Sequence, residues 1–285
     1  MIWISDQWKD YEVLDTSDGE RLERWGKHIL VRPDPQVIWA TPHSHPAWKK
    51  YDARYVRSAT GGGHWTDHKL PERWQIKYKD YLTFNVKPMN FKHTGLFPEQ
   101  AVNWDLLINT IKNAGRPVSV LNLFAYTGAA SIVCAKAGAN VTHVDAAKSM
   151  IDISKENAKL NGIDNIRYIN DDCQKFVERE IRRGKKYDIV LMDPPSFGRG
   201  PKGETWKIED DIFNFVNLVK DVVSDNALMV LINSYTTGLQ PTVMANILNC
   251  VFPNGKVDAY EIGLPTAQSG IVLPCGCTAV KHLNK

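Results

Sequence analysis

The feature that most constrains the fold is an alternation of short apolar runs and helix-like segments that begins at Val118. The apolar runs cover residues 118–124, 141–146, 166–171, 187–193 and 227–235. Segments with helical spacing lie between them. Strands that alternate with helices form βαβ units and a parallel sheet, and near-continuous apolar strands fit a sheet covered on both faces. The sequence therefore predicts an α/β fold with five parallel strands.

The C-terminal segment departs from this alternation. Two strand-like runs, 256–265 and 271–280, are joined by only five residues. A parallel crossover needs a dozen or more residues, so this pair is expected to form an antiparallel hairpin. A dinucleotide-binding Rossmann fold would end in a sixth parallel strand instead.

A change in composition near residue 92 predicts two domains, 1–92 and 93–285. Residues 1–92 hold 15 Lys and Arg against 12 Asp and Glu, and the remainder holds 20 of each, so the whole net charge of +3 lies in the first segment. That segment also carries seven of the nine tryptophans. We expect a small, mainly β domain there, with a hairpin at Asp18-Gly19, two strands within 28–40 and one long strand over 74–86.

Composition excludes several classes of protein. The chain is 43% hydrophobic and 24% charged, which is typical of a globular protein. Five cysteines without regular spacing indicate a reducing compartment, and we expect a cytoplasmic protein without a signal peptide or membrane span. The histidines at 43, 45, 64 and 68 lack a supporting ligand pattern, so no metal site is expected.

Ligands of open α/β sheets bind beyond the carboxyl ends of the strands, so these ends hold the candidate cofactor site. The first strand ends in Phe124-Ala125-Tyr126-Thr127-Gly128. Here Thr127 is expected to cap the next helix, and Gly128 lets the backbone approach a ligand. The Gly-x-Gly-x-x-Gly pattern of pyrophosphate sites is missing, which favours a nucleoside without a pyrophosphate.

The next two strands end in acids. Asp145, followed by Ala146, can accept both hydroxyls of a ribose, although it can also cap the following helix. Asp172, followed by Cys173, can accept from an adenine amino group or act as an ordinary cap.

The fourth strand ends in Asp193-Pro194-Pro195-Ser196-Phe197. The prolines hold the backbone rigid and lack N–H groups, so nearby carbonyls can accept from a substrate. Asp193 can orient an amino group, and Phe197 can stack on a flat heterocycle. The alternative is a stiff loop without a catalytic role.

These motifs resemble class I S-adenosylmethionine-dependent methyltransferases, and more narrowly the group that contains the bacterial 23S rRNA methyltransferases forming 5-methylcytosine and 7-methylguanine. The resemblance covers about residues 80–240. It implies a domain at 93–285 that binds S-adenosylmethionine. It also implies that Gly95, Phe97 and Gln100 lie near the cofactor. The positive surplus and the many Trp and His residues of 1–92 make that segment the expected substrate-recognition domain.

One departure bears on the reaction. Formation of 5-methylcytosine requires a cysteine thiolate, and the members of the group that form it carry this cysteine just after the fifth strand. Here Ser234 and Tyr235 occupy that stretch. We therefore expect a nitrogen or oxygen acceptor rather than a ring carbon.

The resemblance implies methyl transfer to RNA, with an rRNA base nitrogen as the expected acceptor. Two observations agree with an RNA partner: a basic loop with Arg199, Lys202 and Lys207, and aromatic and basic residues in the first 92. The latter could equally form a small-domain core. A small molecule or protein side chain remains an alternative acceptor, because the second domain is electrically neutral. A noncatalytic nucleoside-binding module and an NAD-dependent oxidoreductase are further alternatives.

Overall fold

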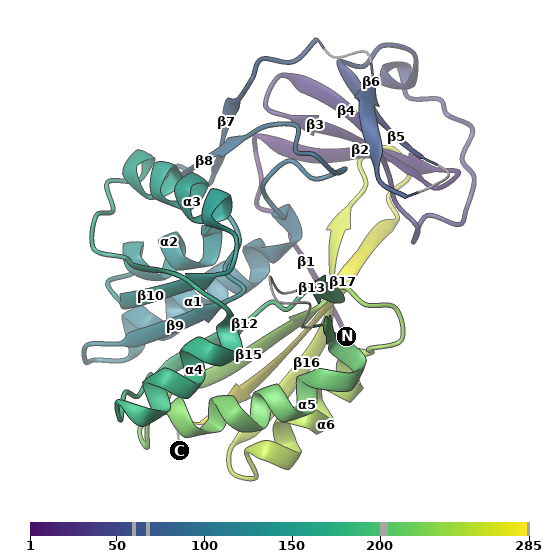
Figure 1. Ribbon diagram of the computed structural model, residues 1–285. Helices are drawn as coiled ribbons and strands as arrows, with labels where there is room; N and C mark the ends of the chain where they lie inside the picture. Colours follow the sequence, from purple (N-terminus) through teal and green to yellow (C-terminus); the bar gives the residue numbers. More distant parts are fainter. Residues whose placement is uncertain (59–60, 67–68, 200–204, 284–285) are drawn as a thin grey trace. The chain divides into compact units, whose positions relative to one another are not determined.

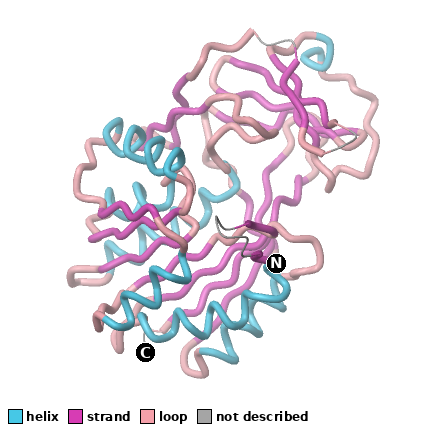
Figure 2. Tube along the Cα trace, viewed as in Figure 1, coloured by secondary structure: helices cyan, strands magenta, loops and turns pink. Residues whose placement is uncertain are grey.

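The chain folds as two compact units (Figure 1). The computed structural model describes residues 1–58, 61–66, 69–199 and 205–283. The front unit comprises Trp3–Val102 and Ile262–Cys275, and the sheet unit comprises Met1–Ile2, Asn103–Glu261 and Gly276–Lys285. Figure 2 shows that the front unit is built mainly of strands, whereas the sheet unit alternates strands with helices.

This division differs from the expected boundary at residue 92 in three places, the first of which is Met1–Ile2 in the sheet unit. Residues 93–102 belong to the front unit, where the Pro98 carbonyl accepts from Ser5 Oγ and Trp8 Nε1, both at 2.9 Å. The tip of the C-terminal hairpin also joins it, because the backbone N–H groups of Ala267 and Gln268 donate to Val13 and Leu14. Long-range contacts of this kind leave no mark on local composition.

The main sheet has eight strands in the order β1-β16-β17-β15-β12-β9-β10-β11. Strands β9, β10, β11, β12 and β15 are mutually parallel, and β17 runs antiparallel to β15. Their bounds are β1 Ile2–Ile4, β9 Ser119–Leu123, β10 Asn140–Asp145, β11 Arg167–Asn170, β12 Ile189–Met192, β15 Met229–Ser234, β16 Lys256–Pro265 and β17 Val272–His282. The expected α/β fold, with five parallel strands and a terminal hairpin, is confirmed.

The described residues form six α-helices. They are α1 Ala101–Asn113, α2 Ala129–Lys136, α3 Lys148–Leu160, α4 Cys173–Arg182, α5 Ile208–Val219 and α6 Pro241–Val251, with a 3-10 turn η3 at Lys220–Val222. Apolar residues of α4, α5 and α6, including Phe176, Phe215 and Leu248, pack in one cluster with the strands. Helices α2 and α3 pack together against β9, β10 and β11 and contribute nothing to that cluster. The sequence motifs did not predict α1.

The front unit contains a five-stranded sheet and a two-stranded one. The larger comprises β2 Tyr11–Ser17, β3 Glu20–Trp25, β4 His28–Pro33, β5 Ala53–Arg57 and β6 Gly63–Thr66, and the smaller comprises β7 Trp74–Tyr78 and β8 Leu82–Val86. Two 3-10 turns are η1 Pro46–Lys49 and η2 Pro98–Gln100. The expected hairpin is confirmed, because Asp18 and Gly19 both have positive φ, 52° and 81°, as a tight type I′ turn requires.

Two expectations for the front unit are wrong. Residues 34–40 form no second strand, because the Val37 and Trp39 carbonyls accept from the hairpin turn at Gly19 and Asp18 instead. The run 74–86 is a hairpin rather than one strand, since Lys79 takes a left-handed conformation (φ 50°) and reverses the chain. An alternating pattern continues through such a turn, so it does not reveal the reversal.

No helix among the described residues is long and apolar enough to cross a membrane.

Candidate functional site

Neighbouring parallel strands bring four segments to one edge of the main sheet. Strands β10, β9, β12 and β15 are consecutive in the sheet and run in the same direction, so the residues after each strand lie at a common edge. These are the loop 124–128 after β9, Asp145 at the end of β10, the Asp193–Phe197 loop after β12 and Ser234 at the end of β15. This edge is where open α/β sheets bind ligands.

The loop 124–128 has an unusual backbone. Phe124, Tyr126 and Gly128 all have positive φ, at 56°, 51° and 86°. Positive φ is costly for bulky residues and persists only where the surrounding structure enforces it, which is common at ligand sites. Here the Ala125 N–H donates to the Val144 carbonyl at 3.1 Å, which ties the loop to the neighbouring strand.

Gly128 closes this loop and caps α2. The expected cap at Thr127 is wrong: Gly128 is the N-cap, and no side chain caps the helix. Thr127 is instead buried, and its carbonyl accepts from Asn157 Nδ2 of α3 at 3.3 Å. A Cβ at Gly128 would lie 1.8 Å from Ser154 Oγ, so both the left-handed backbone and the contact with α3 require glycine.

Asp145 joins the loop to the start of α3. Its Oδ2 accepts from the Tyr126 N–H and its Oδ1 from the Ala147 N–H, both at 2.8 Å. The N-cap of α3 is Ala147, so Asp145 is not itself the cap. Burial raises the pKa of Asp145 above its usual value, and the two backbone donors oppose that shift. Each carboxylate oxygen keeps a further lone pair, so two hydroxyl donors can still be accepted.

The residues after β11 have structural partners. Asp172 is exposed and is the N-cap of α4, with Oδ1 accepting from the Lys175 N–H at 3.0 Å. Cys173 is buried, its Sγ accepts from the Phe124 N–H at 3.2 Å, and burial raises its pKa well above the usual range. Ala146 is exposed, and its carbonyl accepts from Asn170 at 2.9 Å. Asp172 thus caps α4 with one carboxylate oxygen, as the interpretation of this residue as an ordinary helix cap predicts.

The segment after β12 forms a braced loop. Asp193 is half-buried, Pro194 is buried, and the Asp193 N–H approaches the Leu123 carbonyl at 3.4 Å. Two carbonyls that were expected to face a substrate already accept hydrogen bonds within the protein. The Pro195 carbonyl accepts from Trp206 Nε1 at 2.7 Å, and the Ser196 carbonyl accepts from the Ile208 N–H at 3.1 Å.

Phe197 begins β13 (Phe197–Arg199), which pairs with β14 (Thr205–Lys207). Its side chain is 52% exposed, with the Arg199 guanidinium 5.8 Å from the ring centroid.

Trp206 is a site residue that the sequence motifs did not indicate. Its ring lies 5.5 Å from Phe124 and 5.6 Å from Phe215, measured between ring centroids, while its indole N–H holds the Pro195 carbonyl. It therefore connects the loop after β9 with the loop after β12. The signal in the sequence was a single tryptophan within a Gly- and Lys-rich stretch.

The end of β15 is also connected to the loop after β12. Ser196 Oγ and Thr236 Oγ1 are 2.5 Å apart, and the Thr236 N–H donates to Ser234 Oγ at 3.2 Å. Cys277 of β17 lies opposite Ser234 in the register. Its buried thiol donates to the Leu239 carbonyl at 3.2 Å, and burial raises its pKa to about 11.

Several candidates lie elsewhere. Gly95, Phe97 and Gln100 belong to the front unit, on or beside η2, and Gln100 is buried. Lys202 and His68 fall outside the described residues. Within the described chain, no group of three or more His, Cys, Asp or Glu side chains is arranged to hold a metal ion.

A parallel sheet with an antiparallel terminal hairpin, a glycine-closed loop after its first strand and an Asp-Pro-Pro segment after its fourth define a Rossmann-like methyltransferase. A family model described as S-adenosylmethionine-dependent methyltransferase matches residues 36–244. A solved S-adenosylmethionine-dependent methyltransferase from Agrobacterium tumefaciens is 35% identical, with a TM-score of 0.94 over 100% of this chain and 94% of that one. The chain belongs to this family of S-adenosylmethionine-dependent methyltransferases.

More distant matches agree with the fold. Two methyltransferase structures, one in complex with S-adenosylhomocysteine and one from Streptococcus mutans, give TM-scores of 0.75 and 0.74 at 20% and 19% identity, each over 97% of this chain and 76% of that one. Among curated proteins, the ribosomal RNA large subunit methyltransferase K/L of Shewanella frigidimarina is 31% identical over 169 residues, which are 58% of this chain and 22% of that protein. The chain thus spans about a fifth of the length of such relatives.

Proposed function

We propose that this chain transfers the methyl group of S-adenosylmethionine to a nitrogen atom of an rRNA base. The observation that carries the proposal is the joined pair of loops after β9 and β12, which brings a nucleoside-binding edge and the Asp-Pro-Pro segment together through Trp206. The similarity to ribosomal RNA large subunit methyltransferases K/L supports RNA as the substrate class.

The residues at the sheet edge fit the cofactor. Asp145 retains lone pairs for two ribose hydroxyls, and the burial that raises its pKa strengthens hydrogen bonds made there. Loop 124–128 supplies a ligand-facing backbone, and Asp172, exposed beyond β11, accepts from the adenine amino group with the oxygen not used in capping. The cofactor itself supplies an electrophilic methyl group on a sulfonium.

The loop after β12 positions the acceptor. Asp193 orients an amino group of the base, and the half-exposed Phe197 ring stacks on its face. Because Pro194 and Pro195 fix the backbone and Trp206 holds the Pro195 carbonyl, the loop is organised before the substrate binds. In-line positioning of this kind provides much of the rate of a transfer to a nucleophilic nitrogen.

The cysteines favour a nitrogen over a ring carbon. Attack on cytosine C6 requires an accessible thiolate. Cys277 lies opposite the end of β15, but its thiol is buried and hydrogen-bonded. Burial also raises its pKa to about 11. Cys173 is buried against the loop after β9 in the same way. Neither thiol is suited to covalent catalysis.

The test is transfer of a labelled methyl group to 23S and 16S rRNA lacking modifications, to tRNA and to a metabolite extract, followed by mass spectrometry of digested nucleosides. We expect an N-methylated base in rRNA, abolished by Asp193→Ala with retained binding of S-adenosylhomocysteine. Labelling only of the metabolite extract would establish the alternative small-molecule acceptor. Formation of 5-methylcytosine would refute the nitrogen assignment.

A further inference from the structure

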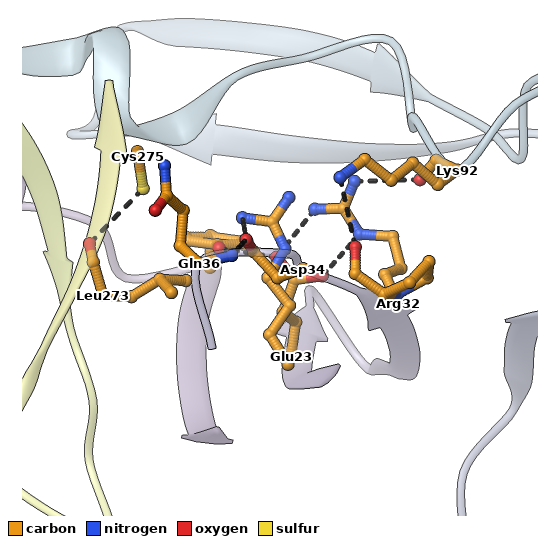
Figure 3. A network of polar contacts seen from close by, with 10 residues as sticks. Glu23, Arg32, Asp34, Gln36, Lys92, Leu273 and Cys275 are labelled. Atoms are coloured by element: carbon orange, nitrogen blue, oxygen red, sulfur yellow. Dashed lines mark hydrogen bonds and ion pairs between the residues drawn. The ribbon is translucent and has the colours of Figure 1, made fainter. Parts of the chain in front are cut away.

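Figure 3 shows a network of hydrogen bonds and ion pairs in the front unit. Its centre is Glu23, which is fully buried and accepts from Arg32 through both carboxylate oxygens, at 2.5 and 2.7 Å. Tyr11 donates its hydroxyl to the same carboxylate at 2.7 Å. Arg32 and Glu23 therefore neutralise each other in a bidentate pair.

Arg21 is held less completely. Its guanidinium lies 3.5 Å from Glu23 and 3.6 Å from Asp34, and its side chain is only 8% exposed. Its Nε is buried and donates to no hydrogen-bond acceptor in the part of the chain that the structure describes. A buried guanidinium donor without an acceptor is costly, because no water replaces the lost bond.

Lys92 lies beside this network and has no carboxylate of its own. Its Nζ donates to the Pro33 carbonyl at 3.1 Å, and its carbonyl accepts from Arg32 at 3.0 Å. Within the described residues, no carboxylate oxygen lies within 4.0 Å of this ammonium. Burial and the neighbouring Arg21 lower its pKa to about 8, although Asp34 opposes the shift. The ammonium retains two further donors.

Cations outnumber carboxylates among the contacts of this network. Three cations, Arg21, Arg32 and Lys92, face two carboxylates, Glu23 and Asp34. The next carboxyl, Glu99, forms no ion pair with these cations within 4.0 Å among the described residues, and its Oε2 has no hydrogen-bond partner there. A surplus buried cation is unfavourable unless an anion accompanies it.

We propose that a backbone phosphate of the RNA substrate binds at Lys92, with Arg21 as a second donor. The inference rests on the proposed RNA substrate. A phosphate oxygen accepts from the free ammonium donors and gives Lys92 the ion-pair partner that it lacks among the described residues. The fully buried Thr94 hydroxyl, also without a hydrogen-bond partner among the described residues, lies two residues further along the segment. Lys92 thus helps to place the RNA without reading its sequence.

The test measures binding of a fluorescein-labelled, single-stranded oligoribonucleotide by anisotropy over a series of KCl concentrations. Lys92→Gln loses one phosphate contact. The plot of log K for RNA association against log salt concentration therefore becomes less steep, by about 0.7. Lys92→Arg keeps the slope, because the charge remains. The matched control is Lys9→Gln, since Lys9 belongs to the same unit but is 75% exposed and paired with Asp80. It leaves the slope unchanged.

A second arm uses inorganic phosphate and thermal unfolding. Phosphate stabilises the wild-type protein and Lys9→Gln more than chloride of equal ionic strength does, and Lys92→Gln loses this difference. Lys92→Gln can lose the stabilisation by phosphate and still show the wild-type salt dependence of RNA binding. In that case the site binds free phosphate and the RNA assignment is wrong. Equal behaviour of all variants in both arms overturns the site. Phosphate binding by a wild-type protein that binds no RNA refutes the proposed function instead.

Discussion

The indole N–H of Trp206 donates to the Pro195 carbonyl at 2.7 Å, across the two segments that flank the candidate site. The same ring packs between Phe124 and Phe215, so one side chain fixes both the loop after β9 and the loop after β12. This contact braces the backbone beside Asp193 and Phe197, the two residues proposed to position the acceptor.

Replacement of Trp206 by Phe tests this brace. The variant keeps an aromatic ring and loses one hydrogen bond, so we expect kcat to fall about tenfold, because about 1.4 kcal/mol of positioning energy is lost. The Kd for S-adenosylhomocysteine should stay close to that of the wild type. Trp74→Phe is the matched control, since it loses a single indole bond to a carbonyl, that of Trp25, in the front unit. An equal fall in kcat in both variants would contradict the brace.

Substitution of Gly128 by Ala should separate backbone strain from a steric clash. The control, Gly138→Ala, lies at the other end of α2, also has positive φ and has no atom within 4 Å of the new Cβ. Both variants should lose about 1–2 kcal/mol of unfolding free energy from the left-handed backbone. Only Gly128→Ala must displace Ser154, so only it should lose affinity for S-adenosylhomocysteine, by about 100-fold in calorimetry. Equal affinities in the two variants would show that the loop tolerates the displacement.

His143 should make stability depend on pH. It is buried in β10 behind the loop, its Nδ1 lies 3.0 Å from Ser131 Oγ, and burial lowers its pKa to about 3. The unfolded chain binds this proton near pH 6.5, so the unfolding free energy falls as pH drops from 6.5 toward 3, by up to about 1.4 kcal/mol per pH unit. In denaturant titrations at several pH values, the unfolding free energy of His143→Gln should depend less steeply on pH, by the equivalent of one proton. His93, whose pKa burial also lowers to about 3, contributes equally in both proteins. Identical slopes would refute the role of His143.

Cys277→Ala should retain methyl transfer. The thiol is buried and bonded to Leu239, so its loss costs packing and one weak hydrogen bond but no covalent step. We expect a lower Tm and a kcat/KM within about twofold of the wild type, because a change of that size in rate corresponds to well under 1 kcal/mol in the barrier. Loss of transfer with retained binding of S-adenosylhomocysteine would reopen the question of a carbon acceptor.

The order of strands and helices from Val118 onward was predictable because each element carries its own signal. Apolar runs predicted the five parallel strands, and a five-residue connection predicted the terminal hairpin. The positions of Asp145 and Asp193 at the ends of strands were predictable in the same way. These inferences depend only on residues close together in the chain.

Tertiary structure decided what depends on partners distant in sequence. The need for glycine at position 128 follows from Ser154 on another helix, and the engaged Pro195 carbonyl follows from Trp206. The front unit gains residues 93–102 and the hairpin tip for the same reason. Local patterns record which side chains prefer burial or a turn, but hydrogen bonds and clashes between distant segments exist only once the chain has folded.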